Sequence, residues 1–266
     1  MENVLELKNK SALVCGATQG IGLATAQLFA RLGCSVIAVA RNSEKLKTTM
    51  DELNLIFPAG RHRFIAGDLE DTQFIINSVQ DTLNSMGDPI EIYVNNSGGP
   101  QMGTLDQVDS ADFVKALNSH LLTPHSLTKL LLPGMKASGY GRIINVLSTS
   151  VRAPIPNLGV SNTTRSAVAA WAKTLANEVA AFGITVNSVL PGCIDTPRSK
   201  AFHLFLAEKN GRTLEEERET WIKSIPARRI GEAEEVAQVI GFLASPLASY
   251  VNGTLIPVDG GRTLTL

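Results

Sequence analysis

The sequence predicts an α/β fold in which helices cover both faces of one parallel sheet of about seven strands. Seven short, β-branched and largely apolar runs recur along the chain, and helical patterns lie between most of them. Near-continuous apolar strands that alternate with helices are typical of a parallel sheet buried on both sides. The predicted strands are residues 11–14, 35–39, 63–66, 90–94, 142–147, 185–190 and 254–258.

Length, charge and cysteine content narrow the functional class. The chain has 266 residues without a linker or repeat, so we expect one domain over residues 1–266. The formal net charge of −1 does not indicate a nucleic-acid surface. No apolar run approaches the ~18 residues of a membrane span, and no signal-peptide pattern is present. Cys15, Cys34 and Cys193 are few, odd in number and in apolar contexts, which predicts reduced thiols and a cytoplasmic location.

The glycine-rich stretch at residues 15–22 is the most informative motif. It follows the first predicted strand and precedes a helical pattern at residues 23–32. Gly16, Gly20 and Gly22 allow a sharp turn and a close approach of the backbone to a ligand. A strand, a glycine-rich turn and a helix N-terminus form the setting that a dinucleotide diphosphate needs. The sequence therefore predicts a Rossmann-type site for a dinucleotide.

Further motifs follow the later strands in a recognisable order. They are Asp68-Leu69 after the third strand, Asn95-Asn96-Ser97-Gly98-Gly99 after the fourth, Pro191-Gly192 and Thr196 after the sixth, and Val258-Asp259-Gly260-Gly261 near the end. Together with the glycine-rich turn they resemble the short-chain dehydrogenase/reductase family over residues 5–262. The resemblance implies a single Rossmann-type, doubly wound domain with three α/β/α layers.

The resemblance also implies which residues hold a nicotinamide nucleotide. Backbone donors for the diphosphate would come from Gly16, Thr18, Gly20, Ile21 and Gly22. Asp68 would accept from the adenine amino group beside the Leu69 backbone, and Asn95 and Gly98 would flank the adenosine ribose. The nicotinamide carboxamide would be held by Pro191, Gly192, Ile194 and Thr196.

The end of the second strand bears on the choice between NAD(H) and NADP(H). An NAD site normally has an acid there to bind the ribose 2′-hydroxyl, and Ala40 stands in its place. Arg41 follows at once and can pair with a 2′-phosphate, with Asn42 as a neutral donor. Gln19 is a mild counter-signal, because many NADP-binding relatives carry a basic residue at that position. The sequence predicts that NADP(H) is favoured over NAD(H).

The catalytic motif departs from the family pattern. Asn118 and Ser148 match family positions, where the asparagine holds a relay water and the serine donates to the reacting oxygen. The family's tyrosine and lysine, thirteen and seventeen positions after that serine, are replaced by Ser161 and Arg165. Ser161 would at best align a water. Arg165 can bind the nicotinamide ribose and stabilise an alkoxide by charge, but it does not release its proton.

Three alternatives stay open for the catalytic site. In the first, the protein is an NADP(H)-dependent oxidoreductase in which Ser148 and Arg165 stabilise the oxyanion and water supplies the proton. In the second, His125 on the helical face of Asn118 is the acid, while His120 faces elsewhere and is structural. In the third, the protein binds NADP(H) as a sensor or partner subunit without reductase activity.

Two further features concern substrate and assembly. Residues 198–224 form a long insertion after the sixth strand, and Phe202, Phe205 and Trp221 within it predict a lid over a small, partly apolar substrate. The helical pattern after Ser161 is apolar on more than one face. One face would pack on the sheet and the other on a symmetry mate, which predicts a homo-oligomer, with a tetramer favoured over a dimer.

Overall fold

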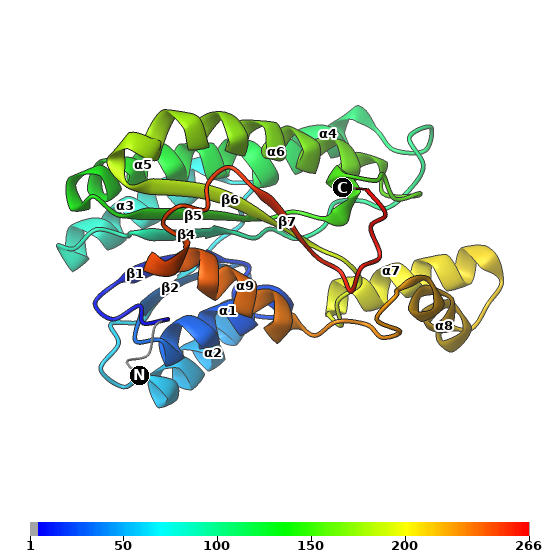
Figure 1. Ribbon diagram of the computed structural model, residues 1–266, viewed down its shortest axis with the longest axis horizontal. Coiled ribbons are helices and arrows are strands. Elements are labelled where there is room, and N and C mark those ends of the chain that lie inside the picture. The colour runs from blue at the N-terminus through cyan, green and yellow to red at the C-terminus, as the bar shows by residue number, and fades with distance from the viewer. Residues whose placement is uncertain (1–4, 266) are drawn as a thin grey trace.

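The predicted sheet is confirmed in a computed structural model that describes residues 5–265 (Figure 1). The described residues form one seven-stranded sheet in the order β3-β2-β1-β4-β5-β6-β7, and every pairing is parallel. The strands are β1 Ser11–Cys15, β2 Ser35–Ala40, β3 Arg63–Ala66, β4 Ile92–Asn95, β5 Gly141–Val146, β6 Ile184–Pro191 and β7 Leu255–Val258. Each lies within two residues of its predicted range.

β1 is the point in the sheet from which successive strands are added first on one side and then on the other. Leu13 of β1 pairs with Ile37 of β2 on one side and with Tyr93 of β4 on the other. The first half of the chain winds outward from this point to β3, and the second half winds outward to β7. In a doubly wound sheet, ligands bind beyond the carboxyl ends of the strands at this switch point. The topology therefore fixes where a site is expected.

Helices cover both faces of the sheet and complete a three-layer, Rossmann-type domain (Figure 1). One layer buries side chains such as Phe29, Leu46 and Ile240 against the sheet and consists of α1 Gly20–Arg31, α2 Ser43–Ile56 and α9 Ala233–Ala244. The other buries Ile75, Leu131 and Leu175 and contains α3 Thr72–Met86, α4 Ser110–Leu117, α5 Thr123–Ser138 and α6 Gly159–Val179. Both faces of every central strand are thus buried, which explains their continuous apolar runs.

A π-helix, η1 (Asn118–Leu122), joins α4 to α5. Such a helix has a wider turn than an α-helix, so it changes which side chains share a face. His120 is buried inside this turn, whereas Asn118 opens it and is partly exposed. Positions before and after η1 therefore do not follow one regular helical period.

The segment between β6 and α9 forms two helices, α7 Pro197–Asn210 and α8 Leu214–Ser224, which lie together beyond the end of the sheet (Figure 1). The Thr196 side chain caps α7 by accepting from Ser199 N–H at 3.2 Å. The Phe202 and Trp221 rings meet edge to face with their centroids 5.7 Å apart, which fixes α7 on α8.

All three cysteines are buried and free, as predicted. Within residues 5–265, no helix combines the length and apolarity needed to cross a membrane.

Candidate functional site

A cavity of about 720 Å³ lies at the carboxyl ends of the strands and crosses the switch point between β1 and β4. The turns after β1, β2, β4, β5 and β6 all contribute to its walls, together with α7. Every predicted site residue lines this cavity except Gly22, Asn95 and Asn118. The fold thus brings the predicted cofactor motifs and the substituted catalytic positions into one space.

The glycine-rich turn leads directly into the N-terminus of α1. Gly16 has φ +64°, and a Cβ there would lie 2.7 Å from Asn96. A Cβ on Gly22 would overlap the carbonyl oxygen of Gly16, so Gly22 packs the helix against the turn instead of lining the cavity. The first turn of α1 carries no acid, and its free N–H groups and helix dipole favour an anion. These features fit a diphosphate.

Basic side chains gather where β2 ends. Arg41 is largely exposed, and its Nη1 lies 3.7 Å from Asp68 Oδ2, which places the two predicted residues side by side. Asn42 caps α2 by accepting from the Lys45 N–H at 2.9 Å, so its carbonyl oxygen is engaged. Lys45 also lines the cavity and was not among the predicted residues. The sequence could have indicated it, because Lys45 is a second cationic residue in the first turn of α2, just after Arg41.

Asn95 has a structural role instead of flanking the cavity. It is buried at the end of β4, and its Nδ2 donates to Asn145 Oδ1 at 2.9 Å and to the His120 carbonyl at 3.4 Å. It therefore ties β4 to β5 and to η1.

Asn118 does not line the cavity either, whereas Ser119, one residue later, does. The geometry does not support a relay through the Asn118 side chain.

His120 is a buried neutral histidine, in keeping with the predicted structural role. Its Nε2 lies 3.0 Å from the Gly98 carbonyl and its Nδ1 lies 2.9 Å from Thr164 Oγ1. Burial, followed by the charge of Arg165, lowers its pKa from 6.5 to about 3. The neutral ring therefore donates from Nε2 and accepts at Nδ1. It holds the loop at Gly98 against α6 beside the cavity.

The three other catalytic candidates meet at one end of the cavity. Arg165 is buried, and it donates from Nη1 to the Val146 carbonyl at 2.8 Å and from Nε to Ser161 Oγ at 3.2 Å. Ser148 Oγ accepts from the Ser150 N–H at 3.1 Å, which leaves its own proton free to donate. Burial, followed by the charge of Arg198, lowers the pKa of Arg165 to about 10, so the guanidinium stays protonated at neutral pH.

No tyrosine lines the cavity in the described part of the chain. Tyr93 is buried in the sheet and Tyr140 donates to the Ala244 carbonyl at 2.5 Å. His125 is exposed on α5, where its Nδ1 accepts from Trp171 Nε1 at 3.2 Å, and it does not line the cavity. The geometry therefore gives no support to His125 as the acid.

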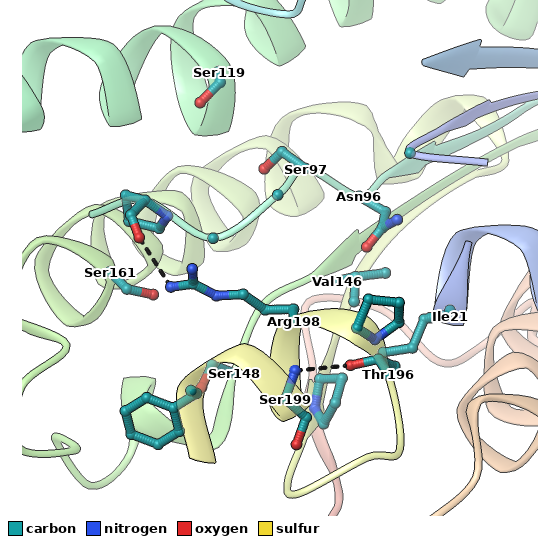
Figure 2. Close-up of a pocket in the computed structure, with 18 of the residues that line it drawn as sticks. Ile21, Asn96, Ser97, Ser119, Val146, Ser148, Ser161, Thr196, Arg198 and Ser199 are labelled. Atoms are coloured by element: carbon teal, nitrogen blue, oxygen red, sulfur yellow. Dashed lines mark hydrogen bonds between the residues drawn. The ribbon is translucent and has the colours of Figure 1, made fainter. Parts of the chain in front are cut away.

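Helices α7 and α8, which form the insertion after β6, contribute one wall of the cavity. Phe202, His203 and Trp221 line it, whereas Phe205 does not. Figure 2 shows the Arg198 side chain crossing the cavity from α7, and its Nη2 donates to the Pro100 carbonyl at 2.9 Å. Arg198 and His203 were not among the predicted site residues, because their direction depends on how α7 leaves β6.

Comparisons with known proteins identify the relatives of this chain. A family model described as enoyl-(acyl carrier protein) reductase matches residues 16–263. The 3-oxoacyl-[acyl-carrier-protein] reductase FabG of Pseudomonas aeruginosa is 34% identical, covering 98% of this chain and 100% of that protein. L-sorbose reductase from Gluconobacter frateurii, solved with NADPH and L-sorbose, has a TM-score of 0.92 at 30% identity, over 99% of this chain and 100% of that one. YwfH, an NADPH-dependent reductase involved in bacilysin biosynthesis, has a TM-score of 0.91 at 28% identity, over 97% and 99%.

Proposed function

Because the chain belongs to the short-chain dehydrogenase/reductase family, we propose that it is an NADP(H)-dependent oxidoreductase that interconverts a carbonyl compound and a secondary alcohol. One observation carries the proposal. The glycine-rich N-terminus of α1 opens into the same cavity that Ser148, Ser161 and Arg165 line at the other end. A nucleotide bound at α1 would thus lead to the groups that can polarise a carbonyl.

The residues around the cavity fit a nicotinamide nucleotide. The turn at Gly16 and Gly20 would bind the diphosphate, and Pro191, Gly192, Ile194 and Thr196 would hold the nicotinamide end. Arg41 and Lys45 supply two positive charges beside the place of the adenosine 2′-phosphate, which supports NADP(H) over NAD(H). When bound, the nicotinamide supplies or accepts the hydride.

The side chains at the reacting end stabilise charge on oxygen. Ser148 would donate its free proton to the substrate oxygen. The fixed charge of Arg165 would stabilise the alkoxide, because two of its donors are already anchored on Val146 and Ser161 and hold it in place. Ser161 would orient a water molecule that carries the proton. Arg165 itself keeps its proton throughout, since even its lowered pKa of about 10 lies well above neutral pH.

A second candidate function is favoured by one specific observation. Within residues 5–265 no tyrosine lines the cavity, and a positioned acid contributes about 10²–10⁴-fold to such reactions. A protein that binds NADP(H) without reducing a substrate, as a sensor or partner subunit, fits the same cofactor residues.

Turnover separates the two functions. Purified protein is mixed with NADPH and a panel of ketones, aldehydes and quinones, and the absorbance of NADPH is followed. The oxidoreductase predicts oxidation that depends on one class of carbonyl and is lost in Arg165→Met. Arg63→Met, on the remote edge strand β3, is the matched control and should keep the activity. NADPH binding without oxidation by any compound would favour the sensor.

We also propose that α7 and α8 act as a lid and that the protein assembles as a homo-oligomer. The exposed side chains of Val114 and Leu122 and the exposed Ala170 lie on α4, η1 and α6. Covering this surface with a second copy would remove apolar area from water. Light scattering of Leu122→Lys against the unmodified protein tests the assembly, with loss of the larger species expected.

A further inference from the structure

We propose that the substrate carries a carboxylate close to its carbonyl group and that Arg198 binds this carboxylate. The inference rests on the proposed function, because it names the substrate class of the same site. It depends on the position of Arg198, on the charges around it and on the absence of an acidic partner within residues 5–265.

The guanidinium of Arg198 is held inside the cavity. It packs against Gly99, where a Cβ would overlap the guanidinium, and its Nη2 donates to the Pro100 carbonyl at 2.9 Å. Among residues 5–265, the other N–H groups of the planar guanidinium have no protein acceptor. Gly99 thus provides the space that Arg198 occupies, and a side chain there would displace it.

The charge of Arg198 has no neutralising carboxylate among residues 5–265. No carboxylate in the described part of the chain forms an ion pair with Arg198 or with Arg165. The acids that line the cavity are engaged or exposed elsewhere: Asp68 lies beside Arg41, Asp112 Oδ2 accepts from the Asp109 N–H in the capping box of α4, and Glu70 is exposed. Two guanidiniums face one partly buried space, and an anion between them would relieve the cost of burying them.

The direction of Arg198 points to the substrate and not to the cofactor diphosphate. In Figure 2 the side chain runs away from Ile21 and Thr196, which flank the N-terminus of α1, and toward Ser161. Arg262, which also lines the cavity, is engaged: its guanidinium stacks 4.1 Å over the Trp221 ring and its Nε donates to Ser224 Oγ. In the described part of the chain, Arg198 therefore keeps unpaired N–H groups beside Ser148 and Ser161. Their planar arrangement matches a carboxylate.

The test uses paired ligands that differ in the carboxylate alone. Calorimetry measures the binding of 2-oxohexanoate and 3-oxohexanoate, and of their uncharged amides, to the protein saturated with NADP⁺. Since the oxidised cofactor cannot reduce them, the heats report binding and not turnover. We expect at least one acid to bind about tenfold or more tightly than its amide, as a charge-assisted pair predicts.

Two variants assign that preference to Arg198. Arg198→Met should remove the preference for the acid, Arg198→Lys should restore part of it, and the Kd for NADP⁺ should stay within about threefold. Arg218→Met is the control, because Arg218 lies on α8 beside Asp195 and does not line the cavity. It should leave both affinities unchanged.

Equal affinity for acid and amide, or no binding of either, would overturn the proposal. A loss of NADP⁺ affinity in Arg198→Met with the acid preference intact would instead assign Arg198 to the diphosphate and also overturn it. An acid preference that depends on Arg198 in a protein that never oxidises NADPH would support the carboxylate site while refuting the reductase. Failure of the inference and failure of the proposed function are thus separate results.

Discussion

Removing the two cations beside β2 should weaken NADPH binding without changing NADH binding. Arg41 and Lys45 line the end of the cavity where we propose that the adenosine binds. In the free protein the Arg41 guanidinium is 80% exposed and only 3.7 Å from Asp68, so this pair contributes well under about 1 kcal/mol to stability. Arg41→Ala and Lys45→Ala should therefore leave the fold intact, and their effect is confined to the ligand.

The size of the effect follows from the exposure of both side chains. A hydrogen bond to a charged group contributes about 1.5–3 kcal/mol, and the low end applies here because water screens an exposed site. Loss of Arg41 should raise the Kd for NADPH about tenfold, loss of Lys45 about fivefold, and loss of both about 50-fold if the two contributions add.

Fluorescence titration of NADPH and NADH at low and high salt provides the assay. We expect the Kd for NADH to stay within about twofold in all variants, and the NADPH effect to shrink as salt rises. The reasoning would be refuted if NADPH and NADH lost affinity equally, or if the unmodified protein bound NADH more tightly than NADPH. Arg31→Ala, at the far end of α1, is a control that should change neither affinity.

Three further perturbations test other parts of the account. Gly22→Ala places a Cβ against the Gly16 carbonyl, so we expect a loss of about 1–3 kcal/mol in unfolding free energy and weaker NADPH binding; normal values in a denaturant titration would contradict the packing argument. Restoring a phenol and an ammonium with Ser161→Tyr and Arg165→Lys should raise any carbonyl reduction by about 10²–10⁴-fold, and an unchanged rate would show that the acid is not what limits turnover. His120 has its pKa lowered from 6.5 to about 3, so the unfolded chain binds the extra proton first and stability falls as the pH drops below 6.5. Between pH 7.5 and 5 this histidine should cost about 2 kcal/mol of unfolding free energy, and His120→Gln should flatten the profile; a slope that the variant leaves unchanged would contradict the assignment.

The strands and the glycine-rich turn could be predicted because their signals are local. Apolar runs define β1 to β7, and glycines are required where Gly16 has positive φ and where Gly22 touches the turn. Motifs that follow parallel strands must also meet at one edge of the sheet, which is why Asp68 and Pro191 line the same cavity.

The differences between the predicted and the observed site depend on less regular features. The π-helix over Asn118–Leu122 shifts the helical register, so Asn118 lies off the cavity while His120 turns inward. Asn95 ends a strand like the other motif residues, but its side chain is used within the sheet by Asn145. The direction of the Arg198 side chain could not be predicted from the sequence, because it depends on the helix cap at Thr196 and on the space beside Gly99.

Calorimetry with NADPH is the most direct test of the central claim, that the cavity beyond β1 and β4 is a site for a nicotinamide nucleotide. The account predicts one site per chain, with NADPH displaced by NADP⁺ and bound far more weakly by Gly22→Ala. If the folded protein shows no heat of binding, of either sign, with NADPH, NADP⁺ or NADH, both the oxidoreductase and the sensor proposals are contradicted.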